Sequence, residues 1–120
     1  ATRSVEQLDL ENDLRAAIAG EGIEVFFQPL VDAVSGRAED AEALVRWVDP
    51  KRGLVSPADF IPIAEETGLI LPLGRRVLRE ACRQCKSWET TLGVRIGVSV
   101  NLSPRQFQDA DLVDIVTLTP

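Results

Sequence analysis

The chain has 120 residues, of which 45% are hydrophobic and 27% charged, with a formal net charge of -6. This length and apolar content predict one compact domain with its own core, and they exclude a chain that is disordered over most of its length. The acidic balance argues against binding to a nucleic-acid polymer or an anionic membrane surface. The absence of histidine excludes catalytic triads and zinc sites that need an imidazole, so any metal would be held by oxygen atoms.

The apolar runs of the sequence are short. None reaches the length of a membrane span, and residues 1–6 are polar and charged, without the apolar core of a signal peptide. We therefore expect a cytoplasmic setting, either alone or as the cytoplasmic part of a membrane-anchored signalling protein.

The first predicted element is an amphipathic helix over residues 5–19. Ser4 and Gln7 fit a capping box at its start, and Gly20 and Gly22 stop it. We interpret residues 1–22 as a linker helix that continues from an upstream domain, and residues 23–120 as the domain that follows.

Two strands are predicted next, over residues 23–31 and about 38–47. β-Branched and aromatic residues dominate the first, and Pro29 favours a strand edge or end. The turn over residues 32–37 contains Ser35-Gly36, and this short connection predicts an antiparallel hairpin.

The second strand carries the most informative residues of the chain. Side chains alternate faces along a strand, so Glu42, Leu44 and Arg46 share one face and Ala41, Ala43, Val45 and Trp47 share the other. Four residues of strand span roughly 13 Å. A carboxylate able to hold a cation and a guanidinium able to hold a phosphate therefore point the same way. An ordinary surface ion pair fits the same residues equally well.

A loop over residues 49–53 precedes a second helix. Ser56 as the cap and Pro57 at the first helical position mark its start, and Gly68 marks its end. Pro62 is expected to break or restart this helix, because proline lacks the N–H that a helix interior needs.

The longest predicted helix covers about residues 72–89, opened by Pro72 and closed before Gly93. Cys82 and Cys85 on it could form a redox pair or half of a metal site. Both fall at helical spacing with the apolar residues of one face, so we interpret them as core residues. The chain has no second cysteine pair to complete a zinc site.

A third strand is predicted over residues 95–102, followed by a cap-proline helix start at Ser103-Pro104 and an apolar stretch over 112–120. Small residues, Gly97 and Ser99, share the strand face of Asn101, which suits a crowded barrel interior. Asn101 lies at the carboxyl end, where ligands bind in α/β folds, although a turn or capping asparagine is equally common. The order of elements predicts a parallel α/β fold that begins with a hairpin.

Several motifs occur together in a recognisable order. They are Phe27-Gln28-Pro29, Ala41–Trp47, Gly53–Pro62, Ala64–Ile70, Leu73–Leu78, Glu80-Ala81-Cys82 and Val98–Ser103. From about residue 10 to 116 the chain resembles the EAL-domain family, the cyclic di-GMP phosphodiesterases of bacterial signalling. The resemblance implies metal-dependent hydrolysis of cyclic di-GMP to pGpG with Mg²⁺ or Mn²⁺.

The resemblance also implies a fold. It is a partial TIM-like (β/α) barrel with an antiparallel first strand, of which about three of eight strands are present here. Residues 23–120 would then be the N-terminal portion of an EAL-type domain.

Site residues follow by the same resemblance. Glu42 and Asn101 resemble the family's metal ligands. Arg46 resembles the arginine that contacts a ligand phosphate, and Gln28 a residue lining the nucleotide site. Leu44 and Pro57 resemble apolar contacts near the ligand.

The chain departs from the family in its extent, because the family's other acidic ligands and its active-site lysine have no counterpart here. We therefore expect this isolated chain to be inactive, although its family is a hydrolase. A non-catalytic nucleotide-sensing or protein-interaction module derived from an EAL domain is the alternative, and a redox protein using the two cysteines is a third. An open barrel leaves an unpaired strand edge, so we expect a homo-oligomer or swapped dimer, downstream of a sensory or GGDEF domain in a longer parent.

Overall fold

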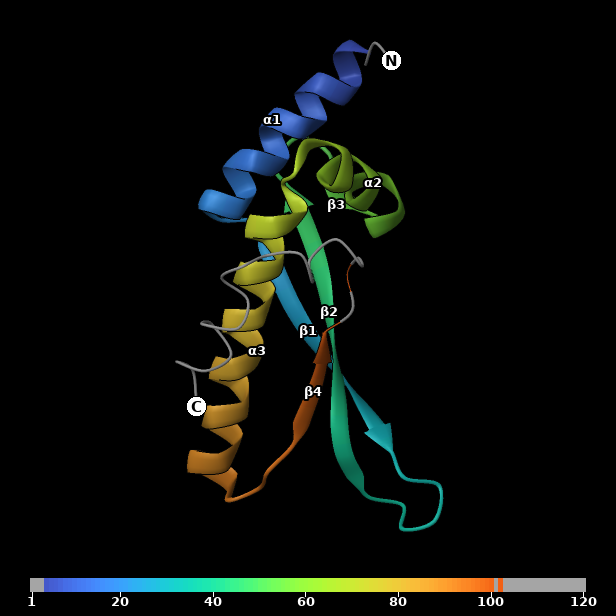
Figure 1. Ribbon diagram of the computed structural model, residues 1–120, viewed down its shortest axis with the longest axis vertical. Helices are drawn as coiled ribbons and strands as arrows, with labels where there is room; N and C mark the ends of the chain where they lie inside the picture. Colours follow the sequence, from blue (N-terminus) through green and yellow to red (C-terminus); the bar gives the residue numbers. More distant parts are fainter. Residues whose placement is uncertain (1–3, 101, 103–120) are drawn as a thin grey trace.

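The computed structural model describes residues 4–100 and Leu102. Figure 1 shows helix α3 running beside the sheet, with α1 at one end of the molecule and the β1–β2 hairpin extending at the other. The elements in chain order are α1 (Val5–Ala19), β1 (Ile23–Val31), β2 (Ala38–Asp49), β3 (Gly53–Val55), α2 (Pro57–Thr67), α3 (Ile70–Leu92) and β4 (Gly97–Val100). In this part of the chain no helix combines the length and the apolar character that crossing a membrane requires.

Strand β2 is the centre of the sheet. It pairs antiparallel with β1 along one edge, with Gln28 opposite Glu42, which confirms the predicted hairpin. Along the other edge it pairs with two strands, parallel with β4 at residues 40–43 and antiparallel with β3 at residues 47–49. The predicted α/β fold with an antiparallel first strand pair is confirmed, with one more short strand, β3, than the sequence predicted.

The starts of α1 and α2 follow from their caps. Ser4 Oγ accepts from the Gln7 backbone N–H at 3.2 Å, and Gln7 Oε1 accepts from the Ser4 N–H at 3.0 Å, so the predicted capping box is present. At α2, Ser56 Oγ accepts from the Ala58 N–H at 3.3 Å.

The predicted break at Pro62 is wrong, because α2 continues through it from Pro57 to Thr67. Phe60, Ile63 and Ala64 bury one face of this helix. That burial outweighs the backbone hydrogen bond that a proline cannot make. The helix ends at Gly68, whose φ of 82° is left-handed, as the glycine signal predicted.

The other boundaries differ from prediction by a few residues. Helix α3 begins at Ile70 rather than Pro72 and ends at Leu92, before Gly93 with a φ of 68°. Strand β4 begins at Gly97 rather than at the predicted residue 95, and residue 101 of the predicted strand lies outside the described residues. The helix start predicted at Ser103-Pro104 and the apolar stretch over 112–120 lie outside the described residues.

The hydrophobic core lies on one face of the sheet, beneath all three helices. The predicted inward row of β2 is buried, and Trp47 and Phe60 are fully buried and meet edge to face with ring centroids 5.7 Å apart. Phe27 of β1 meets Trp88 of α3 in the same way at 5.4 Å. The core residues are Leu14, Ala17, Ile23, Ala43, Val45, Trp47, Val55, Phe60, Ala64, Leu69, Ile70, Leu73 and Val77.

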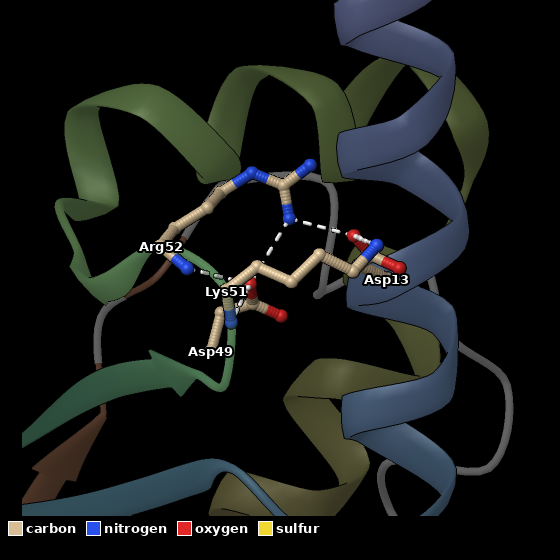
Figure 2. A network of polar contacts seen from close by, with 4 residues as sticks. All are labelled: Asp13, Asp49, Lys51 and Arg52. Carbon is tan, nitrogen blue, oxygen red and sulfur yellow. Dashed lines mark hydrogen bonds and ion pairs between the residues drawn. The ribbon is translucent and has the colours of Figure 1, made fainter.

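A polar network fastens α1 to the turn between β2 and β3. Arg52 donates to Asp13 Oδ2 at 2.6 Å, and Lys51 Nζ lies 3.2 Å from the same oxygen. Figure 2 shows both cations and the buried Asp49, which accepts from the backbone N–H groups of Lys51 and Arg52. The hydrogen bond from Arg52, followed by that from Lys51, lowers the pKa of the Asp13 carboxyl below its ordinary value.

The carboxyl end of α1 is held by Arg76 of α3. Its guanidinium donates to the carbonyl oxygens of Ala17 at 2.8 Å, Ile18 at 2.8 Å and Gly20 at 2.7 Å. The last carbonyls of a helix lack partners within the helix, and a cation there also complements the helix dipole. Two independent sets of contacts thus hold α1, one to the turn between β2 and β3 and the other to α3.

Candidate functional site

The sheet face opposite the helices carries the predicted site residues. Side chains of paired strands point to the same side, so Glu42, Leu44 and Arg46 of β2 share this face with Phe26 and Gln28 of β1. Glu42 and Leu44 are half-buried and the other three are exposed. The predicted division of β2 into a core row and an open row is confirmed.

Glu42 is the middle of a row of oxygen-bearing side chains. Its register partners are Gln28 on β1 and Ser99 on β4. Neighbouring strands lie about 4.8 Å apart, so the three side chains are within reach of one small ligand. The predicted second metal ligand, Asn101, lies outside the described residues.

Asp40 adds a second carboxylate on the same face, and sequence reasoning did not single it out. Its register partner is Gly97, and a Cβ built on Gly97 would lie only 2.8 Å from Asp40 Oδ1. The glycine opposite Asp40 was the available signal, because its lack of a side chain leaves room for the carboxylate in the position that the structure shows.

These residues do not complete a metal site by themselves. Among the described residues no group of three or more acidic, cysteine or histidine side chains could hold a metal ion. Mg²⁺ demands near-octahedral oxygen coordination, and Glu42 offers one carboxylate flanked by two neutral groups.

A groove of about 580 Å³ opens beside this row. Within the described chain, β4 pairs with β2 only as far as Ala43 and β3 pairs only from Trp47 onward, so the intervening edge of β2 stays unpaired. The groove therefore contains Leu44, Arg46 and Pro57, three of the predicted ligand contacts, whereas Gln28 and Glu42 lie outside its lining. Its lining residues are Ala43, Leu44, Val45, Arg46, Leu54, Val55, Ser56, Pro57, Ile61 and Leu102.

The surface ion pair between Glu42 and Arg46, which was the alternative interpretation from the sequence, is not formed in the part of the chain that the structure describes. The Cζ of Arg46 instead lies 4.2 Å from the centroid of the Phe26 ring. The guanidinium is thus held by an aromatic face, which takes up no hydrogen-bond donor.

Cys82 and Cys85 are free, half-buried thiols on α3. Cys85 Sγ donates to the carbonyl oxygen of Ile96 at 3.4 Å. Burial raises the pKa of both thiols, so they stay protonated and weakly nucleophilic near neutral pH. These features favour the packing role predicted for them over redox chemistry.

The family model of the EAL domain matches residues 11–119 of the chain. The chain belongs to the EAL domain family. This EAL chain is 45% identical over 111 residues to the bifunctional diguanylate cyclase/cyclic di-GMP phosphodiesterase MucR of Pseudomonas aeruginosa. It is 43% identical over 107 residues to the cyclic di-GMP phosphodiesterase PdeR of Escherichia coli.

A solved structure agrees with the sequence relatives. The PaMucR phosphodiesterase in complex with c-di-GMP matches with a TM-score of 0.83 and 42% identity. The match covers 92% of this EAL chain and 45% of that chain. The match to MucR covers 92% of the present chain, and the match to PdeR covers 89% of it. In each case the matched part is only 16% of the length of the relative. The chain therefore presents part of an EAL domain.

Proposed function

We propose that this chain contributes the N-terminal part of a binding site for cyclic di-GMP. The observation that carries the proposal is the groove along the edge of β2, which is unpaired there within the described residues and which brings Leu44, Arg46 and Pro57 together. Support also comes from MucR and PdeR, both named as cyclic di-GMP phosphodiesterases, and from the similar structure in complex with c-di-GMP.

Each groove residue suits a different part of a cyclic dinucleotide. The planar guanidinium of Arg46 offers paired donors that match two phosphate oxygens. Leu44 and Pro57 offer apolar surface to a base or ribose, and the side-chain amide of Gln28 offers both a donor and an acceptor. The site would therefore select an anionic ligand with flat apolar parts.

Glu42 and Asn101 would hold Mg²⁺ or Mn²⁺, by resemblance to the family. Such an ion would neutralise the phosphodiester and lower the pKa of a bound water. Because the described residues supply too few oxygens to complete its coordination, we infer that this chain alone does not hydrolyse cyclic di-GMP. Mn²⁺-dependent turnover by the pure chain, abolished by Glu42→Ala, would overturn that inference.

A second candidate function is nucleotide sensing or partner docking without hydrolysis. It is favoured by the small number of metal-ligating groups near Glu42, because among the described residues no group of three or more acidic or cysteine side chains could hold a metal ion. Binding of cyclic di-GMP without turnover, in a longer protein that contains this chain, would select this candidate over the phosphodiesterase.

The organisation around the site is part of the proposal. We propose residues 1–22 as a linker to an upstream sensory or GGDEF domain in a cytoplasmic signalling protein, and residues 23–120 as the EAL portion. We also propose that the chain self-associates, because an unpaired strand edge and exposed apolar side chains favour pairing with a second copy. A monomer by light scattering at tens of micromolar, with a cooperative melt, would contradict self-association.

Isothermal titration calorimetry with cyclic di-GMP and Mn²⁺ tests the proposed function. Arg46→Gln should weaken binding by about tenfold or more, as expected for a charge-assisted phosphate contact. Arg37→Gln is the matched control, because Arg37 is an exposed arginine in the hairpin connection, away from the groove lining. The titrations should include a longer protein that contains this chain, and equal affinities for the two variants would refute the role of Arg46.

A further inference from the structure

Arg46 and Phe26 form a stack across the two strands of the hairpin. In the register of β1 and β2, Phe26 lies opposite Leu44, so its ring is the diagonal neighbour of Arg46 on the open face. The guanidinium Cζ lies 4.2 Å from the ring centroid, well within the range of a cation–π contact. Both side chains are exposed, so the stack lies at the surface where a ligand would arrive.

The residue directly opposite Arg46 is an acid, Glu24. Glu24 is on the same face of the sheet, and a carboxylate there could take two guanidinium donors in a bidentate pair. Among the residues that the structure describes, no ion pair joins Glu24 to Arg46. The guanidinium lies over the aromatic ring instead.

This choice of partner matters for ligand binding. A guanidinium that lies over a ring is attracted by the ring's π face and spends no donor on a carboxylate, so its N–H groups remain available to another acceptor. A guanidinium paired with a carboxylate has already used those groups. The ring also restricts a long side chain that would otherwise lose rotamer freedom on binding.

We propose that Phe26 is a positioning residue for Arg46, one that keeps the guanidinium donors available to a phosphate of the ligand. The inference rests on the proposed function, in which Arg46 contacts a phosphate of cyclic di-GMP. Phe26 itself acts through Arg46, since it does not line the groove.

A double-mutant cycle on cyclic di-GMP affinity tests this. Phe26→Leu should weaken binding about two- to fivefold, the range expected for an exposed cation–π contact, and Phe26→Tyr should restore it to within about twofold. In an Arg46→Gln background Phe26→Leu should have almost no further effect. Leu30→Ala is the matched control, because Leu30 is 43% exposed on the same strand face as Phe26, which is 42% exposed.

The stack can also be observed without ligand. The Arg46 Nε–H resonance, assigned by its loss in Arg46→Gln, should be shifted upfield by the ring and should return toward the ordinary position in Phe26→Leu. Equal losses from Phe26→Leu in both backgrounds would overturn the positioning role, as would an unshifted Arg46 resonance. Binding that depends on Arg46 but not on Phe26 defeats this inference alone, whereas a wild type that does not bind defeats the proposed function together with it.

Discussion

Phe60 of α2 should control both the stability of the fold and the shape of the groove. It is fully buried, its ring meets Trp47 of β2 edge to face, and its helix begins at Pro57, which lines the groove. Phe60→Leu removes the aromatic pair, worth about 0.5–1.5 kcal/mol, and leaves a cavity about the size of a methyl group, worth about 1 kcal/mol. We therefore expect the free energy of unfolding to fall by about 1.5–2.5 kcal/mol.

Urea denaturation followed by tryptophan fluorescence measures this change. The control is Leu54→Ala, because Leu54 also lines the groove but is 65% exposed, so its loss should cost less than about 0.5 kcal/mol. We also expect Phe60→Leu to weaken cyclic di-GMP binding, because Pro57 would be held less firmly. If Phe60→Leu lowers the free energy of unfolding no more than Leu54→Ala does, α2 is not anchored on β2 through this ring.

Three further predictions concern the attachments of the helices. The lowered pKa of Asp13 means that its pair with Arg52 stabilises the fold above pH 3.8, and this contribution is lost as the pH falls through the folded-state pKa. Asp13→Asn should therefore remove this part of the pH dependence of the unfolding free energy, measured by urea titration at a series of acidic pH values. An unchanged pH dependence in Asp13→Asn would contradict the role of the pair. Arg76→Met should lower the free energy of unfolding by about 1–2 kcal/mol, because the last carbonyl groups of α1 lose their hydrogen bonds to Arg76. Arg79→Met is the control, since Arg79 is an exposed arginine of the same helix. Equal losses in the two variants would argue against a stabilising role for the Arg76 contacts. The half-buried thiol of Cys85, whose pKa is raised by desolvation, should react with a thiol reagent at pH 7.5 more slowly in the folded than in the urea-unfolded chain. Equal rates would contradict its protection.

Local signals in the sequence predicted the helices well. The capping box at Ser4 and the Ser56-Pro57 pair mark helix starts that the structure reproduces, because caps act within one turn of chain. Pro62 misled the prediction, since its cost is local but the burial that outweighs it comes from the tertiary fold. Period-two alternation in β2 likewise predicted which residues face the core.

Long-range contacts could not be predicted in the same way. The pair between Asp13 and Arg52 joins residues 39 positions apart, and no local pattern specifies it. The stack of Arg46 on Phe26 depends on the register of β1 against β2, which alternation alone leaves undetermined. The groove arises because β3 and β4 share one edge of β2 at its two ends, a feature of topology rather than of any one segment.

We propose that cyclic di-GMP binds in the groove beside residues Leu44–Arg46 of β2. Backbone amide shifts in an ¹⁵N spectrum, recorded while cyclic di-GMP is added with Mn²⁺ replaced by diamagnetic Mg²⁺, locate the ligand directly. We expect shifts concentrated at Leu44–Arg46 and at residues 54–58, with the exposed side of α3 unchanged. Shifts confined to α3 or to the end of the hairpin, with none along the edge of β2, would contradict it.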